Sequence, residues 1–360
     1  MTDVASLPTG RKTIREQVAR HPLIAFLVLA YAITWATWPL NVRFDFGVVN
    51  GFGILSLMGP ALAAMIVLAV LRPEPSGVPA GKRWRLFGML SILSLTVLAV
   101  VRLWRAAGLV TAGGIPGTSA PYPSLTAFLV DGLAAAGVAL VFSGIYASRQ
   151  GVRDLLRSLD PRARPVPWYG WALAIGLYPA VVALGNAIGA AVGMPLPARN
   201  TAGPWLWLAL DALIMFPYFV FGGGGLEEPG WRGFLLPRLQ KLYSPLRSSL
   251  ILAILWAFWH WPFLQGGLPG IVVYLLLVVA PLAILFTAVY NWTRGSLLVV
   301  ILLHASVNLT EQYLPPSTLA TGVWLLLILA VAVWMWRSPQ AFSFRQAENE
   351  RGRDSVVVAG

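Results

Sequence analysis

Apolar segments of about 20 residues recur along almost the whole chain, and this is the length that a helix needs to cross a bilayer. Hydrophobic residues make up 58% of the 360 residues and charged residues only 11%, whereas soluble domains are about a quarter charged. Inside a membrane, only helices and closed barrels satisfy their backbone hydrogen bonds. Because the segments lack the alternating pattern of barrel strands, the sequence predicts an all-α polytopic membrane helix bundle.

About ten segments have the composition of membrane spans, and we expect eight to ten of them to form transmembrane helices. They cover residues 22–41, 51–71, 86–104, 125–147, 168–193, 204–225, 248–265, 270–290, 295–313 and 318–336. The first segment is long and lacks a small-x-small cleavage site, so we interpret it as an uncleaved helix. Residues 148–167 carry an amphipathic stretch, which favours a helix lying on the membrane surface.

Positive charge is distributed unevenly between the connections of these segments. All but four of the 26 Lys and Arg residues fall in the terminal tails and in alternate connections; the four are Arg43, Arg102, Arg105 and Arg199. Positive residues accumulate on the cytoplasmic side of a membrane protein. We therefore predict a multi-pass protein of the cell (plasma) membrane with both termini in the cytoplasm. The net charge of +12 then reflects topology, with anionic membrane lipids rather than nucleic acid as the partner.

Two adjacent carboxylates, Glu227 and Glu228, follow an apolar run in the stretch FGGGGLEEPGWRGFLLP. In a continuous helix, Glu228 and Arg232 are placed for an i,i+4 ion pair, and Glu227 faces elsewhere. Alternatively, the glycine run ends one helix and Pro229 opens the next as a first-turn residue. In both geometries one carboxylate is fixed by arginine and the other can accept a proton, as the activation of water requires. A solvated acidic turn is the simpler alternative.

The chain has three histidines and no cysteine, which excludes disulfides, thiolate metal sites and a cysteine nucleophile. His260 and His304 lie well inside apolar segments, where ionisable side chains are costly and are functional candidates. His304, Asn308 and Glu311 share one helix face. The imidazole and amide could hold an oxyanion, or Asn308 could form an interhelical hydrogen bond. Glu311 is expected to be solvated near the outer end of its helix.

Two further carboxylates, Asp131 and Asp211, lie several residues inside predicted spans. We interpret them as helix-packing or cavity residues rather than catalysts. Gly185, Gly189 and Gly193 repeat at four-residue spacing, which favours close packing against a neighbouring helix.

Three short motifs resemble those of a known family. EEPGWRG at 227–233, WAFWH at 256–260 and HASVN at 304–308 resemble, in order and rough spacing, the Glu-Glu-x-x-x-Arg, Phe-x-x-x-His and His-x-x-x-Asn motifs of the CAAX protease and bacteriocin-processing family of intramembrane endopeptidases. Trp256 stands where the family usually has phenylalanine. Each motif alone is weak, but three in order within apolar helices are fairly specific.

The resemblance implies hydrolysis of a peptide bond inside the membrane, in a prenylated CAAX-like or another membrane-anchored substrate. Glu227 would activate water with Glu228 assisting, Arg232 would orient both glutamates, and His260 would complete the water site. The family fold implied by the resemblance is a bundle of transmembrane helices, which agrees with the composition.

The resemblance further implies that His304 and Asn308 stabilise the tetrahedral oxyanion. Two alternatives remain for a metal. The family chemistry is compatible with glutamates alone, yet two Glu and two His could hold Zn²⁺ or another divalent ion with a position left for water. No His-Glu-x-x-His spacing is present. If a metal is bound, its expected ligands are Glu227, Glu228, His260 and His304.

We therefore predict the following organisation: a basic cytoplasmic tail at 1–21, an N-terminal transmembrane region without recognised motifs at 22–200, a catalytic transmembrane core at 201–313, a last transmembrane helix at 314–336 and a polar cytoplasmic tail at 337–360. Two alternatives to an endopeptidase remain. Buried Glu, Arg and His also suit a transporter, and a non-catalytic immunity or scaffold protein would carry the same motifs.

Overall fold

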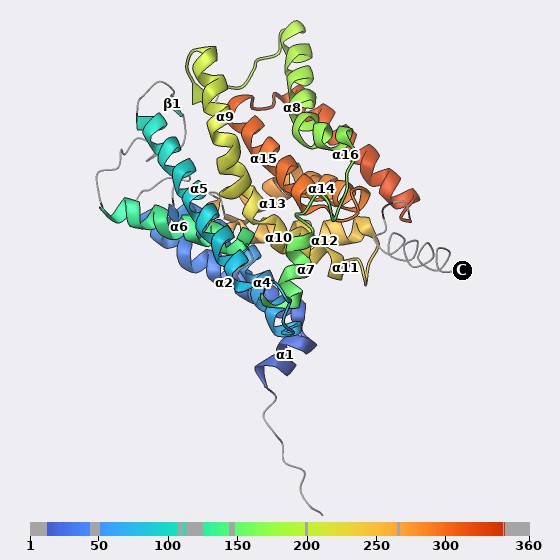
Figure 1. Ribbon diagram of the computed structural model, residues 1–360. Helices are drawn as coiled ribbons and strands as arrows, with labels where there is room; N and C mark the ends of the chain where they lie inside the picture. The colour runs from blue at the N-terminus through green and yellow to red at the C-terminus, as the bar shows by residue number, and fades with distance from the viewer. Residues whose placement is uncertain are drawn as a thin grey trace, which may run out of the picture.

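The computed structural model describes residues 13–43, 51–106, 111–112, 125–143, 148–198, 201–264, 267–340 and 342. These residues form a helix bundle (Figure 1). The one strand pairing among them joins β1 (Thr111–Ala112) to β2 (Thr201–Ala202), each two residues long. The predicted all-α class is therefore confirmed. Most of the predicted tails at 1–21 and 337–360 lies outside the described residues.

The helices begin and end at defined residues. They are α1 (Ile14–Arg20), α2 (Pro22–Arg43), α3 (Gly51–Leu57), α4 (Gly59–Leu71), α5 (Ala80–Ala106), α6 (Leu125–Ser143), α7 (Gln150–Arg157), α8 (Trp168–Ala191), α9 (Trp205–Phe221), α10 (Glu228–Gly230), α11 (Leu236–Leu239), α12 (Pro245–Trp259), α13 (Gly267–Tyr274), α14 (Ala280–Trp292), α15 (Leu297–Tyr313) and α16 (Thr318–Arg337). Short 3₁₀ turns form η2 (Gly224–Leu226) and η4 (Trp261–Phe263), and π-helical turns form η3 (Trp231–Leu235) and η5 (Leu275–Val279).

Six helical stretches within the described residues are long and apolar enough to cross a membrane: Pro22–Pro39, Ala80–Trp104, Trp168–Ala191, Trp205–Leu239, Gly267–Trp292 and Thr318–Arg337. Four shorter apolar helices, Gly59–Leu71, Phe128–Ser143, Pro245–Trp259 and Leu297–Tyr313, coincide with the remaining predicted spans. The chain is thus a multi-pass membrane protein. The cytoplasmic placement of both termini stays a prediction.

Two predicted spans differ from the observed helices. The 51–71 segment is two helices, α3 and α4, which meet at Met58 because Pro60 lacks the N–H that a continuous helix needs. The 204–225 span is longer than expected, since helical structure resumes after a break and continues to Leu239. The helical structure that resumes after the break carries the paired carboxylates, and it therefore sets the position of the candidate site.

Backbone hydrogen bonds link three connections around α7, which lies in the lower part of the bundle in Figure 1. The backbone N–H of Ser76 donates to the carbonyl of Ser148, and Arg149 pairs with Pro75 in an isolated bridge. The N–H of Leu297 donates to the carbonyl of Ser158. The connections around 72–85, 148–167 and 291–296 therefore lie next to one another, and the side of the membrane that they face stays a prediction. The amphipathic stretch forms α7, which buries Val152 and Leu155.

The stretch that carries the paired carboxylates is the broken second half of the Trp205–Leu239 span. Helix α9 ends at Phe221, η2 forms one tight turn, and helical structure resumes at Glu228 with Pro229 in its first turn. Glycine disfavours helix and proline fits a first turn, so of the two predicted geometries the break is the correct one. The i,i+4 ion pair between Glu228 and Arg232 forms as well.

Glycine is required in this break because neighbouring groups occupy the space of a side chain. A Cβ built at Gly224 would overlap the imidazole of His304, and one at Gly225 would overlap the carbonyl of Val220. The backbone therefore lies directly against α15. The break folds the following turn into the bundle instead of letting it emerge as a loop.

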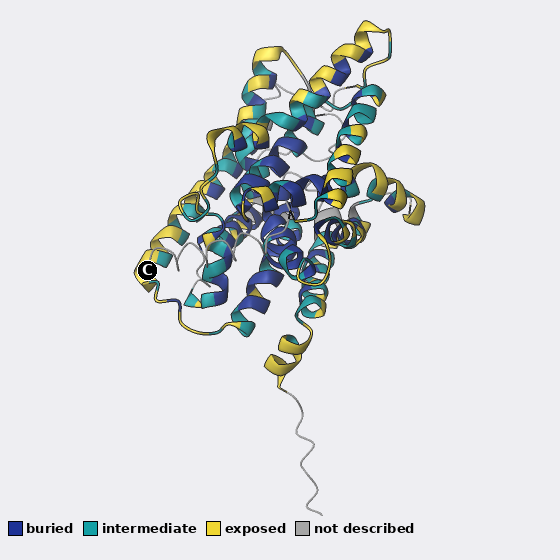
Figure 2. Cartoon of the chain, turned by 90° about the vertical axis from the view of Figure 1, so that its right-hand side faces the viewer, coloured by how far each residue is buried: buried dark blue, intermediate teal, exposed yellow. Residues whose placement is uncertain are grey.

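The assignment of Arg232 to the cytoplasmic charges was therefore wrong. Its side chain has 0% exposure and lies inside the bundle. Residues 226–235 belong to the helical stretch Trp205–Leu239 and do not form a surface connection. Figure 2 shows that buried residues concentrate in the middle of the bundle, and the fully buried aromatic residues Trp231, Trp259, Phe234 and Phe286 belong to this core.

The two isolated aspartates have packing roles, as predicted. Asp131 on α6 accepts hydrogen bonds from the guanidinium of Arg102 on α5, and both side chains are buried. Asp211 on α9 accepts from the hydroxyl of Tyr313 on α15. A Cβ at Gly185 on α8 would overlap Ala320 on α16, so this glycine does permit close helix packing.

Candidate active site

A cavity of about 520 Å³ lies between α8, α12 to α15 and α16. Glu227, His260, His304 and Asn308 all contribute to its wall. They come from the break before α10, the end of α12 and the middle of α15. Most of the remaining wall is apolar, formed by residues that include Leu57, Val182, Leu277, Val278, Leu282, Val307 and Trp324. Four of the six predicted site residues thus share one largely apolar cavity.

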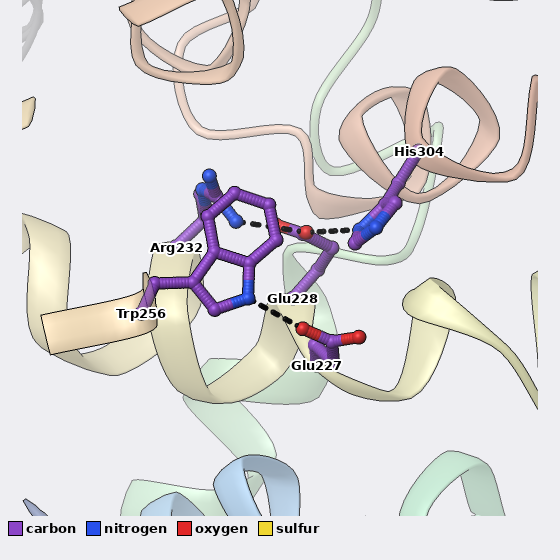
Figure 3. A network of polar contacts seen from close by, with 5 residues as sticks. All are labelled: Glu227, Glu228, Arg232, Trp256 and His304. Carbon is purple, nitrogen blue, oxygen red and sulfur yellow. Dashed lines mark hydrogen bonds and ion pairs between the residues drawn. The ribbon is translucent and has the colours of Figure 1, made fainter. Parts of the chain in front are cut away.

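The other two predicted residues, Glu228 and Arg232, lie behind the cavity wall and are wholly buried. One oxygen of Glu228, Oε1, accepts from Nη1 of Arg232 at 2.9 Å and from Nδ1 of His304 at 2.6 Å. Figure 3 shows these two contacts converging on a single oxygen. Glu228 therefore fixes the imidazole of His304. Unlike Glu227, it does not line the cavity.

The guanidinium of Arg232 is held by aromatic faces. Its central carbon lies 4.3 Å from the ring centroid of Trp256 and 4.7 Å from that of Phe286. Its Nε and Nη2 have no hydrogen-bond partner among the described residues. Because aromatic faces attract a cation that has lost its water, these rings compensate in part for the missing partners. Arg232 orients Glu228 directly through their hydrogen bond, whereas the hydrogen bond to Glu227 comes from Trp256.

Trp256 contacts Glu227, and sequence analysis missed this role. Its indole N–H donates to Oε2 of Glu227 at 2.6 Å (Figure 3). The same ring lies edge-on to His304 at a centroid distance of 5.5 Å and next to His260 at 5.8 Å. Phenylalanine, the usual family residue, has no donor to offer a carboxylate. The sequence shows that Trp256 replaces the usual phenylalanine, but not that its N–H meets Glu227.

His260 ends α12 and faces the cavity. Its Nδ1 lies 2.8 Å from the carbonyl oxygen of Trp256. A carbonyl can only accept, so Nδ1 carries the hydrogen and Nε2 of the neutral ring carries the lone pair. The ring packs edge-on against Trp259 and Tyr274 at centroid distances of 4.8 and 5.2 Å. These contacts therefore fix the orientation of the ring and of its proton acceptor, Nε2.

His304, Asn308 and Glu311 lie along one side of α15 and all line the cavity, as their spacing predicts. The amide of Asn308 faces the same cavity, where it can donate to a ligand. Glu311 is not the solvated residue that was expected. It is partly buried in the cavity wall and accepts from the hydroxyl of Tyr178 on α8.

The four residues proposed as metal ligands do not form a metal site. Among the described residues, no group of three or more His, Asp or Glu side chains is placed to hold an ion. Glu228 is already engaged by Arg232 and by His304, whose Nδ1 points at the glutamate instead of at a shared ion position. The four residues are therefore not arranged as the ligands of a bound metal.

If the cavity hydrolyses peptides, as the resemblance of the three motifs implies, replacing Trp256 with phenylalanine is expected to lower kcat at least tenfold, because a hydrogen bond to a charged group contributes about 1.5–3 kcal/mol. The substitution keeps the aromatic face over Arg232 while removing the donor to Glu227. Phe258→Leu on the exposed side of α12 is the matched control and should leave kcat unchanged. A Trp256→Phe enzyme with wild-type kcat would show that the indole N–H does not position Glu227.

Comparison with known proteins agrees with the site. Residues 209–310 match the family model described as type II CAAX prenyl endopeptidase Rce1-like. A curated relative, CAAX prenyl protease 2 of Methanococcus maripaludis, is 28% identical over 124 residues, which cover 30% of this chain and 45% of the relative. Residues 209–310 are thus similar to type II CAAX prenyl endopeptidases of the Rce1-like kind, which agrees with the resemblance drawn from the three motifs. The match spans less than half the length of that relative.

Proposed function

We propose that the chain is an intramembrane endopeptidase that hydrolyses a peptide bond of a membrane-anchored or lipidated, CAAX-like substrate in the cell membrane. The observation that carries this proposal is the shared cavity, in which a carboxylate, two imidazoles and an amide from separate helical segments face one apolar space. This set supplies a base, a proton carrier and donors for developing charge. The family match over the same residues supports it.

Glu227 is the proposed general base. A water molecule between its carboxylate and Nε2 of His260 would give a proton to Glu227 as its oxygen attacks the scissile carbonyl carbon. The indole N–H of Trp256 fixes Oε2 of Glu227, so the proton goes to a carboxylate of defined orientation. When the C–N bond breaks, the same proton passes to the leaving amine.

Asn308 and His304 are the proposed oxyanion donors. The amide of Asn308 donates directly to the carbonyl oxygen as negative charge develops on it. Since Nδ1 of His304 is engaged by Glu228, its Nε2 can donate only when the ring is doubly protonated. Glu228 is therefore proposed to hold His304, instead of assisting the attacking water, and Arg232 to hold Glu228.

The proposal is tested by a peptidase assay of the full chain in lipid nanodiscs against a library of membrane-anchored peptides, with and without prenyl groups. His260→Ala, His304→Ala and Asn308→Ala should each lower kcat/KM by about 10²–10³, the usual effect of removing a proton carrier or an oxyanion donor. Activity should survive chelation of divalent metal. Wild-type rates in all three variants would overturn the catalytic assignment.

Two other outcomes are distinguishable in the same preparation. Uptake of a solute into liposomes that is lost in the same variants would support a transporter. Absence of both hydrolysis and uptake would support a non-catalytic immunity or scaffold role.

A further inference from the structure

Tyr274, the last residue of α13, brings a phenol hydroxyl into the wall of the cavity that holds the proposed catalytic residues. It is the one side chain with a polar tip in the apolar stretch GLPGIVVYLLLVVAPLAIL at 267–285. The two residues before it, Val272 and Val273, are 45% and 56% exposed on the outside of the bundle. Because tyrosine hydroxyls in apolar surroundings usually meet a hydrogen-bond partner, this one is a candidate ligand contact.

The aromatic ring of Tyr274 packs against His260. The two ring centroids are 5.2 Å apart and the rings are nearly perpendicular, with an interplanar angle of 67°. The π-helical turn η5 begins at the next residue, and such turns occur frequently at functional sites. The contact places Tyr274 beside the proposed water site. A phenylalanine would keep the ring contact and lose only the hydroxyl.

Electrostatic contacts locate the hydroxyl across the cavity from α15. The carboxylates of Glu227 and Glu311 both act electrostatically on Tyr274. Glu311 lies on the same side of α15 as His304 and Asn308, and Glu227 belongs to the break whose backbone lies against His304. The hydroxyl is therefore near both ends of this row of polar residues, and it faces the part of the cavity into which His304 and Asn308 project.

A neutral donor at this position would complement the other two. The ordinary pKa of a phenol is about 10, so the hydroxyl of Tyr274 carries its hydrogen throughout the neutral pH range. Nδ1 of His304 is engaged by Glu228, so Nε2 can donate only from the doubly protonated ring. Asn308 supplies one neutral donor from α15. Donors that are held in place around a developing negative charge stabilise the transition state of acyl transfer.

We propose that Tyr274 is a further oxyanion donor, whose hydroxyl donates a hydrogen bond to the carbonyl oxygen of the scissile peptide bond. Tyr274 donates from α13, whereas Asn308 donates from α15. The hydrogen bond strengthens as negative charge develops on the oxygen, and no proton is transferred to it. This inference rests on the proposed function, since it assigns a residue to the same reaction.

The first test compares Tyr274→Phe with the wild type in the nanodisc peptidase assay, on the best substrate of the membrane-anchored library. The variant should lower kcat by about 10², the usual effect of removing one oxyanion donor, and should change KM by less than about twofold. Tyr243→Phe removes a hydroxyl from a residue that is 44% exposed and does not line the cavity. It is the matched control and should keep the wild-type kcat.

A second measurement separates a donor from a residue that only supports His260. Two fluorescent, membrane-anchored peptides with the sequence of that substrate are titrated by anisotropy. One carries a phosphinate in place of the scissile amide and mimics the charged tetrahedral intermediate, and the other carries a neutral ketomethylene group. Tyr274→Phe should weaken binding of the phosphinate peptide at least about tenfold and that of the ketomethylene peptide by less than about twofold. Thermal unfolding verifies that the variant is folded.

The results separate this inference from the proposed function. A lower kcat together with selective loss of phosphinate binding supports Tyr274 as a donor. A Tyr274→Phe protein with the wild-type kcat, or with equally weakened binding of both peptides, overturns the donor role while hydrolysis by the wild type still supports the endopeptidase. A wild type that hydrolyses no peptide of the library contradicts the proposed function, and this inference with it.

Discussion

Replacing Glu227 with glutamine is expected to lower kcat for peptide hydrolysis by about 10²–10⁴, the range contributed by a positioned general base. Glutamine has nearly the same shape, and its amide oxygen can still accept the hydrogen bond from Trp256. The substitution thus removes proton acceptance and leaves the surrounding contacts in place. The rate is measured on the best substrate of the library, with KM determined in parallel.

Glu74→Gln provides the control for this variant, since Glu74 is exposed and far from the cavity along the chain. Its kcat should equal that of the wild type. A Glu227→Gln protein that is as stable as the wild type and hydrolyses the substrate at the wild-type rate would rule out Glu227 as the base.

Replacing Arg232 with alanine is expected to lower the free energy of unfolding by about 3–5 kcal/mol, because removing one partner of a buried ion pair leaves the other charge uncompensated. Arg232 and Glu228 both have 0% side-chain exposure, and their ion pair is 2.9 Å long. The guanidinium also fills the space between Trp256 and Phe286. Unfolding is followed by circular dichroism in mixed micelles of increasing denaturing detergent.

A double variant separates the charge effect from the packing effect. Arg232→Met with Glu228→Gln removes both charges, keeps apolar volume between the rings and retains an acceptor for Nδ1 of His304. It should be more stable than Arg232→Ala by at least about 2 kcal/mol, since replacing a buried pair by uncharged groups is often nearly neutral. Equal stability of the two variants would show that the charge of Glu228 is not what Arg232 compensates.

Much of the fold was predictable because the membrane restricts it. Long apolar segments in a bilayer must be helices, and local composition marks where they begin and end. The break at the glycine run before Glu227 was also predictable in kind, since glycine and proline act on the local backbone. The shared face of His304, Asn308 and Glu311 followed from helical spacing alone.

Other features depended on contacts between distant segments. Arg232 was grouped with cytoplasmic charges, because spacing does not show that residues 226–235 fold inward against α15. Glu311 was expected in solvent, and only the approach of Tyr178 on α8 places it in the cavity wall. Spacing also does not show that Glu228 is engaged by Arg232 and His304 instead of facing the cavity with Glu227.

The sequence by itself determined the membrane-spanning helical class, the three motifs and the residue types of the site. The tertiary structure decided which of the two adjacent glutamates faces the cavity and which one is buried behind its wall. Glu227 faces the cavity under the indole of Trp256, while Glu228 is turned toward Arg232 and His304. Adjacent residues point about 100° apart on a helix. Which of the two glutamates faces the cavity depends on where α12 and α15 pack against this turn. Because α12 and α15 are distant in the chain, local sequence does not determine that packing.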